Sequence, residues 1–335
     1  MTSPASPSES APIVCIGNAI VDVIARAEDD FLTRNRLEKG SMRLIDAEEA
    51  ERLYAKMAAG QESSGGSGAN TAAGIAALGG TTRFIGRVSD DQLGRVFQHD
   101  IRAAGVAFDT PFSTSEVPTA RCLINVTPDA ERTMCTFLGT SAELAEGDVD
   151  YDAIGAASIV YLEGYLWDAE DARAAMEKAR DTVRAAGGRV SFTLSDLFCV
   201  DRHRSDFLAL ADGGVDILFA NEQELKSLYE TEDFGAALSA QEGRCELAVV
   251  TRGPLGAVVL NGSERIEVPA QPVASVVDTT GAGDLFAAGF LAGLQQGRSP
   301  HDCALLGTVA AGEIISHYGA RPLADLKALA SKALS

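Results

Sequence analysis

The sequence is poor in basic residues. It carries 28 Lys and Arg against 48 Asp and Glu among 335 residues, which gives a formal net charge of −20. A chain this acidic repels a phosphate backbone, so we expect no sequence-independent binding of nucleic acid and no docking on anionic membranes. No window reaches about 18 consecutive apolar residues, and we therefore expect no membrane span.

Cysteine motifs for metal binding are also missing. The six cysteines are scattered, with no CxxC pair and no CxxC…HxxxH spacing. This pattern predicts reduced, buried thiols in a cytoplasmic protein. Residues 1–11 (MTSPASPSESA) are polar and lack the basic and apolar regions of a signal peptide, so we predict a disordered tail there.

Strand-like and helix-like segments alternate along a chain of ordinary composition, with 46% hydrophobic and 23% charged residues. The length suits two domains or one large α/β unit. The clearest helical pattern covers residues 169–186 and ends at Gly187-Gly188. The alternation predicts a mainly parallel sheet flanked by helices. Short apolar runs typical of its strands are 12–17, 82–88, 158–162, 189–194, 215–219 and 247–251.

Two stretches interrupt this alternation. Residues 41–45 (SMRLI) and 121–138, which contains CLINV and TMCTFL around the turn 127–130, are typical of antiparallel strands. They predict a small sheet that stands off the main one, as a lid would. Because no Pro/Gly/Ser-rich linker divides the chain, we expect one domain over residues 12–335 with this lid inserted, formed by about 22–45 and 108–140.

The densest chemical signal is DTTGAGD, residues 278–284, followed by an apolar helix of small residues. Gly281, Ala282 and Gly283 let the backbone approach a ligand closely, and the helix that begins there points unpaired N–H groups at the same place, which predicts an anion hole. Asp284, in the first turn, is placed to take a proton from an attacking hydroxyl. The alternative is an aspartate that only complements the helix dipole, but that role does not require the GAG run.

A second glycine cluster is GGSGAN, residues 65–70, which leads into another helix. Its Asn70 amide can both donate to and accept from sugar hydroxyls, although a flexible loop is an equal interpretation of the cluster alone. Neither cluster has the GxGxxG dinucleotide pattern, and the sequence has no GxxxxGK[ST] phosphate loop. A phosphate-handling site here must take its positive charge from backbone amides, a metal and an arginine.

The two clusters, in this order and about 210 residues apart, resemble the PfkB or ribokinase family of small-molecule kinases. The resemblance implies a ribokinase-like α/β fold, a doubly wound, mainly parallel sheet flanked by helices with a small inserted β-sheet lid. It implies ATP and Mg²⁺ as cofactors, Asp284 as catalytic base and Gly281, Ala282 and Gly283 as the anion hole. The stretches LEGYLWD, TLSDLFCVDRHR and ILFANEQEL are most similar to the bacterial adenosine kinase branch.

The resemblance also assigns residues to the acceptor. Asn18 and Asp22, at the end of the first predicted strand, match the positions that hold it, and Gly65, Gly66 and Asn70 close around the same sugar. Asp22 can accept from two vicinal hydroxyls, which suits a ribose 2′,3′-diol. Without the family context, Asp22 is equally a solvated aspartate that leaves a strand. The family has glycine where Ser89 precedes Asp90-Asp91.

The nucleotide end is assigned in the same way. Asn221 and Glu224 match the NxxE element, in which Glu224 orders water around Mg²⁺, whereas by itself NEQEL is an ordinary helix start. Thr251, Arg252 and Gly253 match the nucleotide-phosphate segment.

Two further expectations concern charge around the phosphates, and a third concerns stacking on the base. Arg132, on the lid hairpin, closes over the transferring phosphoryl group, unless it is a surface arginine paired with Glu131 or Asp129. Asp278, Thr280 and Gly319 match a site for a monovalent cation such as K⁺, although Leu323 stands where some relatives place a serine. Aromatic candidates for stacking on a purine are Phe137, Tyr165, Trp167 and Phe198.

We therefore predict ATP-dependent phosphoryl transfer to a primary hydroxyl of a small molecule. The leading candidate for the acceptor is the 5′-hydroxyl of adenosine, which would give AMP. The alternatives are a sugar kinase acting on ribose, fructose or a related sugar, and a non-catalytic regulator that binds a nucleoside or sugar. Either a monomer or a homodimer is compatible with the predicted lid edge.

Overall fold

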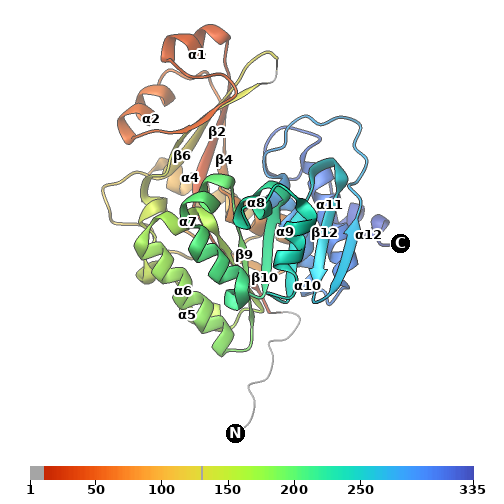
Figure 1. Ribbon diagram of the computed structural model, residues 1–335. Helices are drawn as coiled ribbons and strands as arrows, with labels where there is room; N and C mark the ends of the chain where they lie inside the picture. Colours follow the sequence, from red (N-terminus) through yellow and green to blue (C-terminus); the bar gives the residue numbers. More distant parts are fainter. Residues whose placement is uncertain (1–10, 130) are drawn as a thin grey trace.

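A computed structural model describes residues 11–129 and 131–335 (Figure 1). The predicted tail lies outside the described residues except for Ala11, whose carbonyl accepts hydrogen bonds from Ser158 Oγ and Gln295 Nε2, both at 2.9 Å. Ala11 is therefore part of the folded domain. Ala130, in the predicted turn, also lies outside the described residues.

The main sheet has eight strands in the order β13-β12-β11-β10-β9-β8-β1-β5. Six neighbouring strands, β11-β10-β9-β8-β1-β5, run parallel to one another. At the β11 edge, β12 and β13 are added as antiparallel strands. The predicted mainly parallel α/β fold is confirmed. The bounds are β1 Ile13–Ile16, β5 Thr82–Ile85, β8 Ile159–Glu163, β9 Arg189–Thr193, β10 Ile217–Asn221, β11 Leu247–Thr251, β12 Ala257–Asn261 and β13 Glu264–Val268.

Helices cover both faces of this sheet, and the alternation along β1 shows why. Ile13 and Cys15 belong to one hydrophobic core and Val14 and Ile16 to the other, so the strand is apolar throughout. The first core is shared by α3 Ser67–Ala77, α4 Gln92–Ala103, α10 Ala282–Gln295, α11 Pro300–Ile314 and α12 Leu326–Ala333. The second is shared by α5 Tyr151–Gly155, α6 Glu170–Ala185, α7 Leu197–Ala209, α8 Glu222–Leu228 and α9 Phe234–Gln241.

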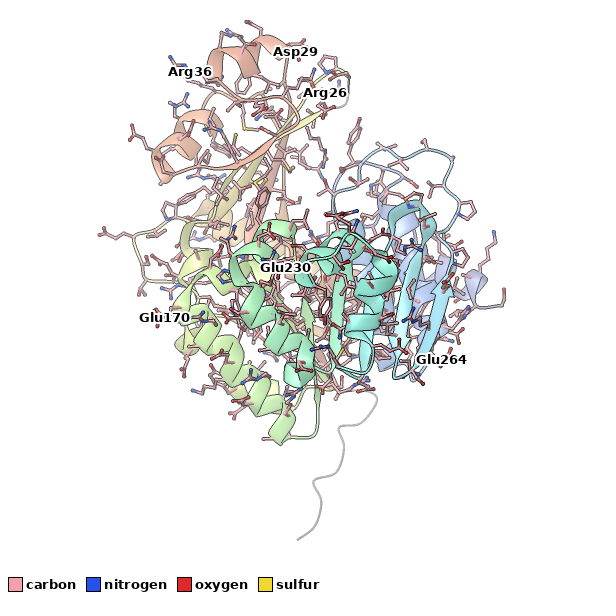
Figure 2. The ribbon with its side chains drawn as sticks, in the orientation of Figure 1. Arg26, Asp29, Arg36, Glu170, Glu230 and Glu264 are labelled. Carbon is pink, nitrogen blue, oxygen red and sulfur yellow. The ribbon has the colours of Figure 1, made fainter. Side chains whose placement is uncertain are left out.

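A second sheet of five strands, in the order β3-β7-β6-β2-β4, stands beyond the main sheet and carries the short helices α1 and α2 on its outer side (Figure 1). Figure 2 shows Arg26, Asp29 and Arg36 at its far end. The bounds are β2 Ile20–Arg26, β3 Met42–Leu44, β4 Gln61–Gly65, β6 Ala120–Val126, β7 Arg132–Phe137, α1 Asp29–Asn35 and α2 Ala47–Tyr54.

The pairing within the small sheet corrects part of the prediction. β6 and β7 form the expected antiparallel hairpin, but β3, predicted as antiparallel from residues 41–45, pairs with β7 in parallel. β3 and β7 are far apart in the sequence, and a parallel pair needs such a long connection, whereas a tight hairpin would produce an antiparallel pair. β2 and β4 also belong to this sheet, whereas the sequence pattern indicated no strand over 61–65.

The strand order fixes where a ligand can bind. From β1 the chain proceeds to β5 on one side and later to β8 on the other, so the order reverses at β1. In open α/β sheets the crevice at the carboxyl ends of the strands on either side of such a switch holds the ligand. In the described part of the chain no helix is long and apolar enough to span a membrane.

Candidate functional site

A cavity of about 450 Å³ opens at the carboxyl ends of the main strands, between the two sheets. It brings together residues from both glycine motifs, from the small sheet and from the ends of β10 and β11. The predicted residues that line it are Asp22, Gly66, Asn70, Asn221, Glu224, Thr251, Thr280, Gly281, Ala282, Gly283 and Asp284. A larger, shallower groove along α4, lined by Asp90, Asp91 and Asp100 among others, contains none of these motif residues.

The start of α10 forms the base of the cavity. Gly281 caps the helix with a φ of +77°, a left-handed conformation that favours glycine. The first hydrogen bond of the helix runs from Leu285 N to Gly281 O at 2.8 Å, so the preceding N–H groups of the first turn have no acceptor within the helix. A Cβ added to Gly283 would meet nothing within 4 Å, so this backbone is open to a ligand. The geometry is that of an anion hole.

Asp284 projects from this first turn into the cavity. Ser67 Oγ donates to its Oδ1 at 2.6 Å, and Asn70 Nδ2 donates to its Oδ2 at 2.9 Å. Burial raises the pKa of the Asp284 carboxyl, and the hydrogen bonds from Ser67 and Asn70 and the charge of Arg321 partly offset that rise. An acid with this environment can accept a proton from a hydroxyl that enters the cavity.

Asp22 lies in the middle of β2, on the face of the small sheet that lines the cavity, and not at the end of the first strand as predicted. The chain leaves β1 at Ile16 and starts a new strand at Ile20, which the sequence did not reveal. Burial raises the pKa of Asp22 to about 6. A Cβ at Gly65 would overlap the Asp22 carboxylate, so this glycine makes room for the acid.

Gly66 begins α3 with a φ of +95°, and a Cβ there would collide with the carbonyl oxygen of Asn18. The two glycines therefore allow close packing of β1, β2 and the start of α3. Asn18 itself does not line the cavity. Its side chain accepts from Ser141 Oγ at 3.0 Å and faces away toward a buried carboxylate.

That carboxylate, Glu163 at the end of β8, is a residue that the sequence reasoning missed. Its Oε1 accepts from Asn18 N at 2.7 Å and from Asn18 Nδ2 at 2.8 Å, while its Oε2 accepts from Gly68 N at 2.7 Å. Burial raises its pKa to about 7, against the opposing effect of these three donors. The available signal was an acid that directly follows the apolar run IVYL, within the stretch LEGYLWD.

Asn221 and Glu224 form a capping box at the start of α8 and also line the cavity. Glu224 Oε2 accepts from Asn221 N at 2.8 Å and its Oε1 from Asn221 Nδ2 at 2.6 Å. The helix-start interpretation of NEQEL is thus correct for its hydrogen bonds. Burial nevertheless raises the pKa of Glu224 to about 7, and no basic side chain of the described residues pairs with it. A buried acid without a positive partner, with free lone pairs toward a cavity, fits water-mediated Mg²⁺.

Of the three residues predicted to bind the nucleotide phosphates, only one lines the cavity. Thr251, the last residue of β11, lines the cavity. Arg252 Nε donates to Glu222 Oε2 at 2.8 Å, and its guanidinium lies 4.3 Å from the centre of the Phe234 ring. The side chain of Arg252 is therefore engaged on α8 and α9, and neither Arg252 nor Gly253 is among the cavity-lining residues.

Arg132 connects the small sheet to the segment before α10. Its Nη1 lies 2.6 Å from Asp278 Oδ2 and donates to Thr280 Oγ1 at 3.1 Å. The surface pairing with Glu131 or Asp129 is not observed; Asp129 pairs with Lys39 instead.

Asp278, Thr280 and Gly319 are brought together as the resemblance implied. The Asp278 carboxylate accepts from Thr280 N at 3.1 Å and from Gly319 N at 3.0 Å. With Arg132 also on this carboxylate, the surroundings of Asp278 are hydrogen-bond donors rather than an open cage of oxygen ligands. The Asp278 carboxylate is therefore occupied by donors, and a monovalent cation bound by the backbone carbonyls of this region, as the resemblance implies, stays a prediction through which we derive no step.

Tyr165 is the one predicted aromatic that lines the cavity, and Phe219 and Phe286 join it there. The other three predicted aromatics lie elsewhere: Trp167 packs edge-on against Phe192 and Phe207, Phe198 is 69% exposed, and Phe137 lies beside Arg121.

Ser89 and Arg321 are not among the residues that line the cavity. Ser89, where the resemblance leads one to expect glycine, has no positive φ, and its hydroxyl donates to Val117 O at 2.5 Å. Arg321, which the sequence reasoning missed, donates to Asn70 Oδ1 and, at 2.8 Å, to Ser64 Oγ.

The comparison with protein families agrees with this geometry. The model of the pfkB family of carbohydrate kinases matches residues 11–326. The chain belongs to this family. The resemblance drawn from the two glycine motifs is thereby confirmed, and this pfkB-family protein is a phosphotransferase with an alcohol group as acceptor. Kinases of this family use ATP.

Solved structures similar to this pfkB-family protein cover nearly all of it. The adenosine kinase from Sinorhizobium meliloti is 50% identical, with a TM-score of 0.89, over 97% of this chain and 99% of that chain. A probable sugar kinase protein from Rhizobium etli CFN 42 is 49% identical, with a TM-score of 0.89, over 97% of this chain and 98% of that chain. A fructokinase from Salmonella typhimurium is 32% identical over 247 residues, 72% of this chain and 80% of the relative. The ribokinase-like fold is confirmed.

Proposed function

We propose that this kinase transfers the γ-phosphoryl group of ATP to the 5′-hydroxyl of adenosine, giving AMP and ADP. The observation that carries the proposal is the division of the cavity into a polar and an apolar part. Asp22, Asn70 and Asp284 provide carboxylate and amide groups for ribose hydroxyls. Apart from Asp22, the side chains that the small sheet presents to the cavity are apolar or weakly polar, namely Ile20, Cys122, Ile124 and Met134, with Thr136.

A purine base needs such an apolar wall, because its faces are poorly hydrated and its area is large. Tyr165 lines the same cavity and offers an aromatic face. A hexose or a pentose alone carries hydroxyls on every side and would leave this wall without a matching partner. The 50% identity to an adenosine kinase supports the same choice.

In the proposed mechanism Asp284 takes the proton of the attacking hydroxyl. The N–H groups of Gly283 and Asp284, in the first turn of α10, stabilise the charge that develops on the phosphoryl oxygens, together with the positive end of the helix dipole. Arg132 lies within reach of Thr280 at the same edge and neutralises phosphate charge when the small sheet closes. Closure excludes water and so limits hydrolysis of ATP.

Mg²⁺ would neutralise the β- and γ-phosphate oxygens. Glu224 would hold it through water, with Asn221 keeping the carboxylate in place through its two N–H donors.

A sugar kinase is the second candidate, because a probable sugar kinase is 49% identical and a fructokinase 32% identical. A non-catalytic nucleoside- or sugar-binding regulator is the third, but a protein that only binds has no use for Asp284 placed beside an anion hole.

The proposed location is the cytoplasm, since all six cysteines, which lie in the described part of the chain, are free thiols. The edge strand β3 exposes Met42 and Leu44, which favours a homodimer over a monomer and is testable by light scattering.

The experiment is a coupled assay of ADP production with purified protein, ATP and Mg²⁺. The acceptors are adenosine, guanosine, inosine, cytidine, ribose and fructose, each titrated to saturation. We expect kcat/KM for adenosine to exceed that for every sugar by at least about 100-fold, equivalent to about 2.7 kcal/mol of transition-state binding. A higher value for fructose or ribose would replace adenosine by that sugar. Thermal stabilisation by adenosine without ADP production would indicate the non-catalytic regulator.

A further inference from the structure

Arg321 lies in the segment between α11 and α12 and reaches between α3 and the small sheet. Two nitrogens of its side chain donate hydrogen bonds to two different elements. Nη1 donates to Asn70 Oδ1 on α3, and Nη2 donates to Ser64 Oγ on β4 at 2.8 Å. Ser64 is fixed in turn, because its N and Oγ both donate to Asp100 Oδ2, at 2.7 and 2.6 Å.

The contact with Arg321 determines the orientation of the Asn70 side-chain amide. A guanidinium only donates hydrogen bonds, so the group that faces it must be the amide oxygen. Asn70 Nδ2 then points the other way, to Asp284 Oδ2 at 2.9 Å. With Ser67 on Oδ1, each oxygen of Asp284 has one donor, and the carboxylate is held in a single orientation.

We infer that Arg321 is a positioning residue of the phosphoryl-transfer site, which orients Asn70 and through it the base Asp284. The inference rests on the proposed role of Asp284. Arg321 does not line the cavity and acts only through Asn70 and its charge.

The contacts of Arg321 indicate that it contributes little to the stability of the fold. Among the described residues its hydrogen-bond partners are the uncharged side chains of Asn70 and Ser64, and its Nε is buried without a hydrogen-bond partner. A buried donor left unpaired costs free energy. The guanidinium does, however, lie near two acids of the cavity and lowers the pKa of both Asp22 and Asp284, against the effect of burial.

The charged groups around Asp284 come from several elements. Arg321 opposes its protonation, whereas the charge of Asp284 raises the pKa values of Asp22 on β2, of Tyr161 and Glu163 on β8, and of Tyr165. The charge of Arg132 on β7 lowers the pKa of Asp22, as the charge of Arg321 does. Loss of Arg321 therefore removes a positive charge that opposes protonation of Asp284, and the pKa of the base rises.

The test compares Arg321→Met, which removes the donors and the charge, with Arg321→Lys, which restores the charge and one donor. The readouts are kcat and the pH profile of kcat/KM in the ADP assay, with the acceptor on which the wild type is most active. For Arg321→Met we expect kcat to fall at least about tenfold and the acid limb of the profile to move up by about one pH unit. Arg321→Lys should return the acid limb to that of the wild type.

Arg87→Met is the matched control, because Arg87 is a half-buried arginine that bonds Ser113 and Asp148 outside the cavity. It should lower stability and leave the pH profile unchanged. A wild-type profile for Arg321→Met, or the same shift in Arg87→Met, would overturn the inference. A crystal structure of Arg321→Met supplies a readout without turnover: Asn70 in its original position on Asp284 would refute positioning. If the wild type transfers no phosphoryl group to any acceptor, the proposed function fails, and this structural arm still decides on Arg321.

Discussion

Ser67 and Asp284 lie 217 residues apart in the sequence, and Ser67 Oγ donates a hydrogen bond of 2.6 Å to Asp284 Oδ1. This bond joins the first turn of α3 to the first turn of α10. The two glycine motifs therefore converge on one carboxylate, at which the proposed acceptor and phosphate parts of the site meet. An alcohol that reaches Asp284 is at the same time at the N-terminus of α10.

The first prediction concerns Asp284→Asn. The asparagine fits the same space: its oxygen can accept from Asn70 Nδ2, and its amide can donate to Ser67, whose hydroxyl both donates and accepts. The fold and the affinity for the acceptor should therefore persist. An amide cannot take a proton, so kcat should fall by about 10²- to 10⁴-fold. Turnover in the ADP assay and acceptor affinity by calorimetry check both parts; a kcat close to that of the wild type would remove Asp284 as the base.

The sequence predicts those parts of the candidate site that depend on local chemistry. Three consecutive small residues before an apolar helix, Gly281 to Gly283, predict an anion hole from geometry that a few residues determine. Strand β11 was predicted at its observed bounds, because a parallel strand buried on both faces is a continuous apolar run.

The sequence was insufficient where contacts join distant elements. Gly68 is 95 residues from Glu163, and Arg321 is 251 residues from Asn70. No local pattern states which buried acid or arginine meets which partner, because the packing of α3 against β8 and of the segment after α11 decides it. The strand that holds Asp22 was missed for a related reason, since β2 exists through its pairing with β4 and β6.

The second prediction concerns Gly283→Ala. Gly283 has no positive φ, and a methyl group there would meet no protein atom within 4 Å, so the fold should keep or slightly gain stability. The methyl group would instead occupy space that the proposed phosphates need, and KM for ATP should rise at least about tenfold.

Gly147→Ala is the control for this change, because Gly147 also has open space and no positive φ but lies in another part of the molecule. Its KM for ATP should equal that of the wild type. An unchanged KM in Gly283→Ala would place the phosphates elsewhere.

The third prediction concerns Glu163→Gln. The new amide oxygen can replace Oε1 as the acceptor for Asn18, but the amide nitrogen then faces the N–H of Gly68, donor against donor. Leaving that buried N–H unpaired should cost about 1–3 kcal/mol of unfolding free energy and loosen the start of α3, which raises KM for the acceptor. Urea unfolding and initial rates measure the two effects. Glu267→Gln, at an exposed position of β13, should change neither, and a variant at Glu163 that behaves like it would show that this carboxylate is dispensable.

The fourth prediction is a fall in stability as the pH rises from about 4.5 to about 7. Burial raises the pKa of Asp22 to about 6 and those of Glu163 and Glu224 to about 7, so the folded protein holds protons that the unfolded chain has already lost. Stability decreases with pH wherever the folded state binds more protons. Asp129, whose pKa is lowered to about 2, acts in the opposite sense only below this range.

The urea midpoint at pH 5 should therefore exceed that at pH 7.5, and the difference should shrink in Glu163→Gln. A midpoint that increases over this interval would contradict the assignment of raised pKa values to these acids.

The last prediction concerns the ion pair between Arg132 and Asp278, which joins the small sheet to the segment that precedes α10. Both side chains are buried, with 9% and 5% of their surfaces exposed, and the nitrogen and oxygen are 2.6 Å apart. Removal of one partner from such a pair typically costs about 3–5 kcal/mol, because the other charge stays buried, although Asp278 keeps its backbone donors at Thr280 and Gly319.

A double-mutant cycle with Arg132→Met and Asp278→Asn, followed by urea unfolding, should give a coupling energy above about 1 kcal/mol. Arg132→Met should also lower kcat in the ADP assay, since the arginine is proposed to neutralise the phosphoryl group. Arg26→Met is the matched variant, at an exposed arginine at the far end of the same small sheet (Figure 2), and should leave both quantities unchanged. Additive single effects would mean that the pair does not form in solution and that the small sheet is held over the cavity by its packing alone.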